Sequence, residues 1–144
     1  MKILFQGGWK KDRDEDKVTG DIKKYCKSLA RFIVDSEHQL ILTSTREHCH
    51  FIASEIAGLV NNNPEELRKK VLFLLPERIR DTPSLGSVQK FDGTKWWQDE
   101  RTYVIQQSDA LIVTGGGRGT FDVIQKAILA NKPVFYPKII KTNS

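Results

Sequence analysis

The chain has 144 residues, the length of one domain, and its 39% hydrophobic and 28% charged residues are typical of an ordinary globular protein. This composition excludes a disordered tail, a collagen-like chain and a disulfide scaffold. No apolar run approaches the about 20 residues of a membrane span, and the apolar start at residues 1–5 is too short for a signal peptide. With only two cysteines, Cys26 and Cys49, we expect free thiols and a cytoplasmic protein whose single domain covers residues 1–144.

The formal net charge is +5, from 23 basic and 18 acidic residues. Much of this charge alternates in sign, as in residues 10–17, so the local field nearly cancels there and a solvated loop is predicted. The excess of cations suits an anionic ligand, which is either a nucleotide or a nucleic acid. The net charge does not distinguish between the two.

Apolar periodicity predicts strands and helices that alternate along the chain. The first half is predicted to hold a strand at 2–5, a helix over 18–33, a strand at 39–42 and, after the polar residues 43–46, a helix with one apolar face at Ile52, Ile56, Leu59 and Val60. A short helical turn after Asn63 and a strand at 71–75 complete this half. The second half is predicted to hold a long loop at 77–95, a helix at 97–104, a strand at 110–113, a helix at 121–128 and a strand at 134–136. The loop contains Pro83, Gly86 and Gly93 and has no clear period. A loop of that length is usually functional or mobile.

Short strands that are apolar on both faces and separated by helices predict an α/β fold. We expect a doubly wound, Rossmann-like parallel sheet of about five strands, in the order 3-2-1-4-5, with helices on both faces. Strands 1 and 4 are neighbours in this order, and ligands bind where the winding reverses between them. Two glycine-rich segments, Gly7-Gly8 and residues 115–119, follow these two strands. Sequence and topology therefore indicate the same crevice.

The strongest chemical signal is the loop Gly-Gly-Gly-Arg-Gly-Thr at residues 115–120. Its glycines allow the backbone to approach a ligand closely, and the N-terminus of the next helix offers N–H groups and partial positive charge to a phosphate. Arg118 adds a fixed charge, and Thr120 adds a hydroxyl that caps the helix or binds a phosphate oxygen. The alternative is a tight turn that only packs the helix on the sheet, for which one glycine would suffice. The loop is neither a Walker A motif nor a GxGxxG fingerprint.

These residues resemble a known family. The stretch Ser-Asp-Ala-Leu-Ile-Val at 108–113, the glycine-rich loop and Asn-Lys-Pro-Val at 131–134 are similar to the SLOG superfamily. That group includes the Lonely Guy phosphoribohydrolases, the Smf/DprA proteins and nucleotide-sensing domains of bacterial antiviral defence systems. The enzymes carry Pro-Gly-Gly-x-Gly-Thr-x-x-Glu, which Gly116, Gly117, Gly119 and Thr120 match, with Gly115 in the proline place. Residues 74–79 and 5–8 are similar to the segments that follow the family's third and first strands.

The resemblance and the predicted topology together imply a ligand site at the carboxyl edge of the sheet. The expected ligand-binding residues are Gln6, Gly7, Gly8, Trp9, Thr43, Ser44, Arg46, Arg78, Arg101, Gly115, Gly116, Gly117, Arg118, Gly119 and Thr120. Trp9 and one of Trp96 and Trp97 either pack against the core or cover an adenine. We expect no cofactor. We also expect no metal site, because His48 and His50 point apart if they lie on a helix.

The sequence departs from the enzymes of this superfamily at the positions that would catalyse hydrolysis. Val123 stands where the enzymes have the glutamate, and Asp122 lies one residue early, about 100° round the helix. Glu100 occupies the place of the enzymes' arginine unless the alignment slips by one residue to Arg101. Residues 43–47 replace the glycine-rich loop expected after strand 2. We therefore expect phosphate binding to be kept, hydrolysis to be lost and no residue to be catalytic.

Three functions follow from this comparison. The first is a sensor domain that binds a nucleotide-derived signal, such as a cyclic ADP-ribose isomer, and regulates an attached effector domain or a homo-oligomer; a chain that ends soon after its last strand fits an excised domain. The second is a Lonely Guy-like nucleoside 5′-monophosphate phosphoribohydrolase, which would need a carboxylate from Asp122, Glu100 or Glu77. The third is a single-stranded nucleic-acid binder, which would need a continuous basic stripe. The interleaved charges make nucleic acid the less favoured partner, and no membrane partner is expected.

Overall fold

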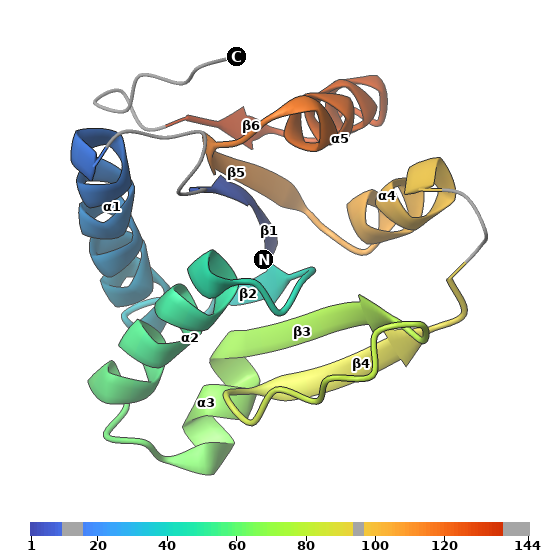
Figure 1. The fold of residues 1–144 in the computed structure, drawn as a ribbon. Helices are drawn as coiled ribbons and strands as arrows, with labels where there is room; N and C mark the ends of the chain where they lie inside the picture. The colour runs from blue at the N-terminus through green and yellow to red at the C-terminus, as the bar shows by residue number, and fades with distance from the viewer. Residues whose placement is uncertain (10–15, 94–96, 137–144) are drawn as a thin grey trace.

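The computed structural model describes residues 1–9, 16–93 and 97–136, which form one parallel sheet with helices packed on both faces (Figure 1). Most of the predicted charged loop, residues 10–15, lies outside this description. The strands are β1 (Lys2–Gly8), β2 (Gln39–Leu42), β3 (Val71–Pro76), β4 (Ser87–Phe91), β5 (Ala110–Gly115) and β6 (Val134–Phe135). They lie in the order β4-β3-β2-β1-β5-β6, and every neighbouring pair is parallel. The predicted order is confirmed as β3-β2-β1-β5-β6, and the sheet has six described strands instead of five.

The additional strand, β4, lies within the segment that the sequence predicts to be a loop. It pairs with β3 from Leu72–Ser87 to Pro76–Phe91 and forms one edge of the sheet. An edge strand needs only one paired side and few buried side chains, so its sequence has no apolar run. Of its five residues only Phe91 is buried. The prediction of a continuous loop was therefore wrong, because the periodicity of a half-exposed edge strand is weak.

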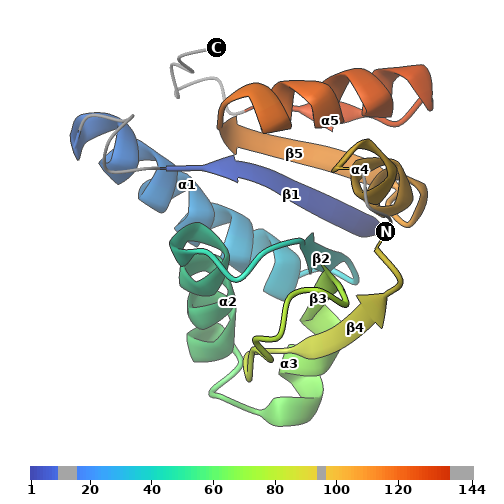
Figure 2. The ribbon, with the colours of Figure 1, turned by 45° about the vertical axis from the view of Figure 1, so that its right-hand side comes forward.

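The helices form two layers, one on each face of the sheet (Figures 1 and 2). They are α1 (Asp16–Val34), α2 (Glu47–Leu59), α3 (Pro64–Lys70), α4 (Trp97–Gln106) and α5 (Arg118–Leu129). Side chains of α1, α2 and α3 share a buried core with Phe5 and Phe73. Side chains of α4 and α5 share another with Leu4 and Leu74. Adjacent residues of one strand thus enter different cores, which explains why the strands are apolar on both faces.

The inner strands β1 and β5 run further than the sequence predicts. β1 and β5 pair through Gly7–Thr114 and Gly8–Gly115, so both glycine segments begin inside the sheet (Figure 2). Gly7 has a φ of +105°, and a Cβ there would lie 2.8 Å from the carbonyl oxygen of Gly115. Only glycine fits this close approach of two backbones. None of the described helices is long and apolar enough to span a bilayer.

Candidate functional site

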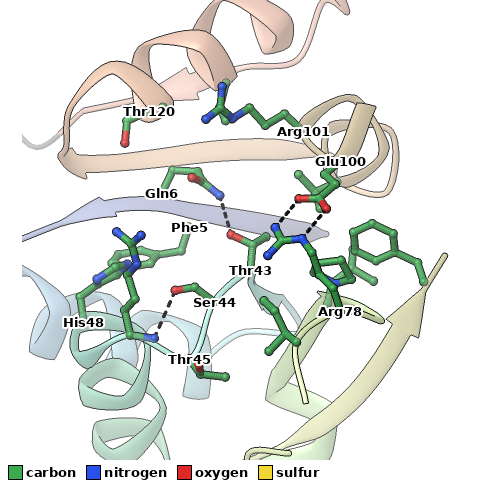
Figure 3. Close-up of a pocket in the computed structure, with 18 of the residues that line it drawn as sticks. Phe5, Gln6, Thr43, Ser44, Thr45, His48, Arg78, Glu100, Arg101 and Thr120 are labelled. Carbon is green, nitrogen blue, oxygen red and sulfur yellow. Dashed lines mark hydrogen bonds and ion pairs between the residues drawn. The ribbon is translucent and has the colours of Figure 1, made fainter. Parts of the chain in front are cut away.

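A cleft of about 760 Å³ opens at the carboxyl edge of the sheet, where the loops after β1, β2 and β3 face α4 and α5 (Figure 3). Nine of the predicted site residues line it: Gln6, Gly7, Thr43, Ser44, Arg46, Arg78, Arg101, Gly119 and Thr120. These residues are far apart in the sequence and come together because parallel strands all end at one edge. The size of the cleft is that of a small-molecule site.

The α5 side of the cleft is the N-terminus of a helix. The turn between β5 and α5 uses positive φ at Gly115 (+88°) and Gly116 (+111°), and a Cβ at Gly116 would lie 2.2 Å from Oγ1 of Thr120. Gly117 is the N-cap of α5 and offers no side-chain cap. The first-turn N–H groups and the positive end of the helix dipole therefore lie beside Gly119 and Thr120, which line the cleft.

The loop between β2 and α2 forms the opposite side. Nε2 of Gln6 donates a hydrogen bond to Oγ1 of Thr43 at 2.9 Å, which ties this loop to the end of β1. Oγ of Ser44 lies 3.3 Å from Sγ of Cys49, and burial raises the pKa of that thiol. Arg46 is the N-cap of α2 and has an exposed side chain. The helix predicted to follow residues 43–46 is confirmed, since α2 begins at Glu47.

An ion pair crosses one end of the cleft, from the segment after β3 to α4 (Figure 3). Nε and Nη2 of Arg78 donate to Oε1 and Oε2 of Glu100 at 2.9 and 2.7 Å. The Glu100 side chain is 10% exposed and that of Arg78 is 50% exposed. The hydrogen bond to Glu100 raises the pKa of Arg78. The two-pronged arginine thus gives this buried carboxylate a hydrogen-bond donor for each of its oxygens at the wall of the cleft.

A second ionic cluster joins α4 to α5 beside the cleft, which its member Arg101 also lines. Nη1 of Arg101 and Nζ of Lys126 contact the two carboxylate oxygens of Asp122 at 3.0 and 3.2 Å. Burial on its own raises the pKa of Asp122, but the hydrogen bonds from Arg101 and Lys126 outweigh it, so the pKa is lowered. Val123, the next residue, lines the cleft instead. Asp122 thus holds α5 on α4 and presents no carboxylate to a ligand.

Six of the predicted site residues do not line the cleft: Gly8, Trp9, Gly115, Gly116, Gly117 and Arg118. Trp9 is 7% exposed and contributes to the core on the α1 and α2 face. Its ring lies 5.5 Å from that of Phe51, with Nζ of Lys23 5.3 Å from its centroid. The packing alternative therefore holds for this tryptophan. Arg118 begins α5 with an exposed side chain, and the side chains of Trp96 and Trp97 lie outside the described part of the chain.

The cleft also contains residues that sequence reasoning did not select. His48 lines it from the first turn of α2, with its ring 6.1 Å from that of Phe5. Arg80 and Asp81 line it from the segment after β3, where Oγ1 of Thr45 lies 3.5 Å from Oδ2 of Asp81. The sequence did offer one signal for these residues: they lie just after a predicted strand or at the start of a helix, and such positions lie at the carboxyl edge of the sheet. Their residue types alone gave none.

The side chains of His48, Cys49 and His50 do not converge on one point. Cys49 is 1% exposed, whereas His50 is exposed. Among the described residues, no three histidine, cysteine or carboxylate side chains cluster in a way that would hold a metal ion. Cys26 is also buried and unbridged, and burial raises the pKa of its thiol to about 12.

No protein-family model matches the chain, and no curated protein matches it significantly. Solved structures do match it. TM1055, a structural genomics target, has a TM-score of 0.73 at 16% identity, and the match covers 98% of this chain and 76% of that one. The molybdenum cofactor carrier protein MCP from Chlamydomonas reinhardtii has a TM-score of 0.63 at 16% identity, over 94% of this chain and 74% of that one.

DNA processing protein A from Helicobacter pylori, whose structure was described for its single-stranded DNA binding mode, has a TM-score of 0.63 at 15% identity, over 99% of this chain and 67% of that one. Identities this low show a shared fold and leave the activity open. The glycine-rich motif predicts the superfamily to which the Smf/DprA proteins belong, and the structural comparison reaches the same fold without using the motif. The chain therefore has the Rossmann-like α/β fold that these three structures share.

Proposed function

We propose that residues 1–144 form a ligand-sensing domain that binds a nucleotide-derived signal, such as a cyclic ADP-ribose isomer, in the cleft. One observation carries the proposal: the cleft joins the N-terminus of α5 to a wall with four arginines, while Val123 stands where a hydrolase of this superfamily would have its glutamate. The arrangement favours binding of a phosphate and disfavours chemistry on the ligand.

The phosphate is expected to lie beside Gly119 and Thr120. Gly119 leaves room for a close approach, and the hydroxyl of Thr120 adds a donor to the N–H groups of the first turn. Arg46 and Arg80 line the same cleft, and neither has a carboxylate partner among the residues that the structure describes. These two arginines can therefore neutralise further anionic charge on a ligand without breaking an existing ion pair.

A sensor also needs a surface that passes its state to an effector domain or to a second protomer. α5 begins at the cleft and carries exposed apolar side chains on its outer side, Phe121, Ile128 and Leu129. Phe135 in β6 and Tyr136 directly after it are also exposed. Exposed apolar groups of this size favour a protein contact. We expect ligand binding at the start of α5 to alter an association made through this helix.

Phosphoribohydrolase activity is the second candidate, favoured by Glu100, which brings a carboxylate to the cleft wall. Both Glu100 oxygens already accept hydrogen bonds from Arg78, so this carboxylate is held away from the role of a mobile base. Incubation with AMP should release no adenine or ribose 5-phosphate above background. Release that stops in Glu100→Gln would favour the hydrolase over the sensor.

A thermal-shift screen tests the sensor directly. The panel contains mononucleotides, ADP-ribose, cyclic ADP-ribose isomers and cyclic dinucleotides. A ligand at a hundredfold excess over its Kd should raise the unfolding free energy by about 2.7 kcal/mol and the Tm with it. A variant that tests the site is Gly119→Val, which should remove the shift because its Cβ would lie 3.0 Å from Nη2 of Arg101 and its methyl groups would crowd this wall of the cleft. A panel in which no member raises the Tm of the natural chain would contradict the proposal.

A further inference from the structure

The cleft holds a carboxylate in surroundings that are otherwise cationic. Four arginines line it, Arg46, Arg78, Arg80 and Arg101, against the carboxylates of Asp81 and Glu100. Asp81 is exposed, but the Glu100 side chain is only 10% exposed. Burial of a carboxylate is unfavourable unless hydrogen bonds replace the lost water. Both carboxylate oxygens of Glu100 therefore need hydrogen-bond donors in place of water.

Arg78 supplies only part of that requirement. A carboxylate has about four acceptor positions, two on each oxygen, and Arg78 donates one hydrogen bond to each oxygen. Gly93 lies beside Oε1 without a side chain of its own, and an added Cβ there would come within 3.1 Å of that oxygen. Among the residues that the structure describes, no other group donates to Glu100, so one acceptor position on each oxygen is left over. The cleft that Glu100 lines is where a molecule can reach these positions (Figure 3).

The surrounding charges limit which chemical group can use these positions. A phosphate would be repelled by the carboxylate itself, and a cationic group would be repelled by the neighbouring arginines. Neutral hydrogen-bond donors remain. Two acceptors on one planar carboxylate match two donors on neighbouring atoms, and the vicinal hydroxyls of a ribose have that arrangement. An acidic residue that reads ribose hydroxyls is an established solution in dinucleotide-binding sheets.

We propose that Glu100, held by Arg78, accepts hydrogen bonds from the 2′- and 3′-hydroxyls of the ligand's ribose. This inference rests on the proposed function and narrows it: the ligand is a ribonucleotide with an unesterified diol, and the cleft discriminates against the deoxy sugar. The ribose then lies against α4, and the phosphate lies toward the N-terminus of α5. Glu100 is a specificity-determining residue in this assignment.

The test compares ligands that differ by one donor. Isothermal titration measures the affinities of AMP, 2′-deoxy-AMP, 3′-deoxy-AMP and IMP, and those of ADP-ribose and its 2′-deoxy form. The natural chain should bind each ribose form at least about tenfold tighter than its deoxy form, the size expected for losing a hydrogen bond to a charged group. IMP should bind like AMP, because the base amine does not contact Glu100.

Two variants and a control complete the experiment. Glu100→Gln should reduce the ribose-to-deoxy ratio to below about threefold, mainly by weakening the ribose forms. Glu100→Asp, which keeps the charge and withdraws the oxygens, should do the same if Glu100→Gln does not fold. Asp81→Asn removes the other cleft carboxylate and should keep the full ratio.

The outcomes separate this inference from the proposed function. If neither these nucleotides nor any member of the thermal-shift panel binds the natural chain, the sensor function itself fails. If nucleotides bind but the ribose and deoxy forms bind alike, or if the ratio survives in both Glu100 variants, only the assignment of Glu100 fails. If the natural chain fails to bind IMP but binds the deoxy nucleotides as tightly as the ribose forms, Glu100 contacts the base amine and the assignment to the ribose is wrong.

Discussion

Gly116 determines the shape of the turn that leads into α5. Its φ of +111° lies in a region that residues with a Cβ rarely adopt, and the Cβ would lie 2.2 Å from Oγ1 of Thr120. Gly20 provides a contrast, because it lies in α1 with no heavy atom within 4 Å of its Cβ position. The same substitution should therefore have opposite effects at the two positions.

Gly116→Ala should lower the free energy of unfolding by about 1–3 kcal/mol, the range for a residue held in an unfavourable backbone conformation. Gly20→Ala should raise it by about 0.5–1 kcal/mol, because alanine is the better residue in a helix interior. Urea denaturation of both variants beside the natural chain measures the two values. Equal effects would mean that the turn relaxes without strain.

Asp122 should make part of the stability depend on pH. Its pKa is lowered in the folded state, so its contribution is fully present above its ordinary value of about 3.8 and is lost as the pH falls through the lower folded value. Asp122→Asn should therefore cost about 1 kcal/mol near pH 7 and progressively less below about pH 4. Thermal unfolding from pH 7 to 3 measures the difference. Lys126→Gln should show a weaker form of the same dependence, and a difference that grows in acid would contradict the assignment.

The sequence identifies some residues of the site and misses others for physical reasons. Gly119 and Thr120 are predictable because their types and order have few uses other than close backbone approach and capping. Trp9 is misjudged because the residue after a glycine pair can turn toward either face of the sheet, and the space beside Phe51 decides that it packs. Glu100 could be named as a carboxylate but not as a buried one, since its burial depends on Arg78, 22 residues earlier.

At the scale of elements, the N-terminus of α5 is the feature on which ligand binding depends. Thr120→Val keeps the shape of the side chain and removes the hydroxyl from the cleft. Nucleotide affinity should fall by about 0.5–1.5 kcal/mol, the usual value of a hydrogen bond. Isothermal titration measures the change, while the Tm without ligand should stay close to that of the natural chain. Thr19→Val, the same exchange in α1, should leave the affinity unchanged.

The strands show what a pattern can and cannot predict. β2 and β3 have apolar residues on both faces and were located within one residue of their observed ends. β4 was missed because its position at the edge leaves Gln89 exposed and only Phe91 buried. The extension of β1 to Gly8 was missed because glycine has no side chain to signal a strand. Gly8 belongs to β1 because it pairs with Gly115 of the neighbouring strand β5.

At the scale of the whole molecule, the charge distribution separates a nucleotide sensor from a nucleic-acid binder. The net charge of +5 is modest, and two of the four cleft arginines are already paired with carboxylates. The affinity for a small nucleotide should change by less than about tenfold between roughly 50 and 200 mM salt, because few phosphates are bound. If the protein instead contacted 6 to 10 phosphates of an oligonucleotide, its affinity for that oligonucleotide would fall by a factor of about 10³ to 10⁵ over the same range of salt. Titration of both ligands at the two salt concentrations distinguishes them, and tight oligonucleotide binding at the higher salt without any nucleotide binding would overturn the sensor.

The pairing of β1 with β5 has a consequence for how the protein is made. β1 lies inside the sheet between β2 and β5, and its Ile3 pairs with Ala110, more than a hundred residues further along the chain. At a synthesis rate of about 5–20 residues per second, β1 waits on the order of 5 to 20 s after leaving the ribosome before its second neighbour exists. During that interval the strongly apolar strand β1 can pair with β2 along one edge, while its other edge has no partner strand. We expect the nascent chain to need protection by a chaperone until β5 emerges, and the ligand cleft to form only when translation has passed Val123.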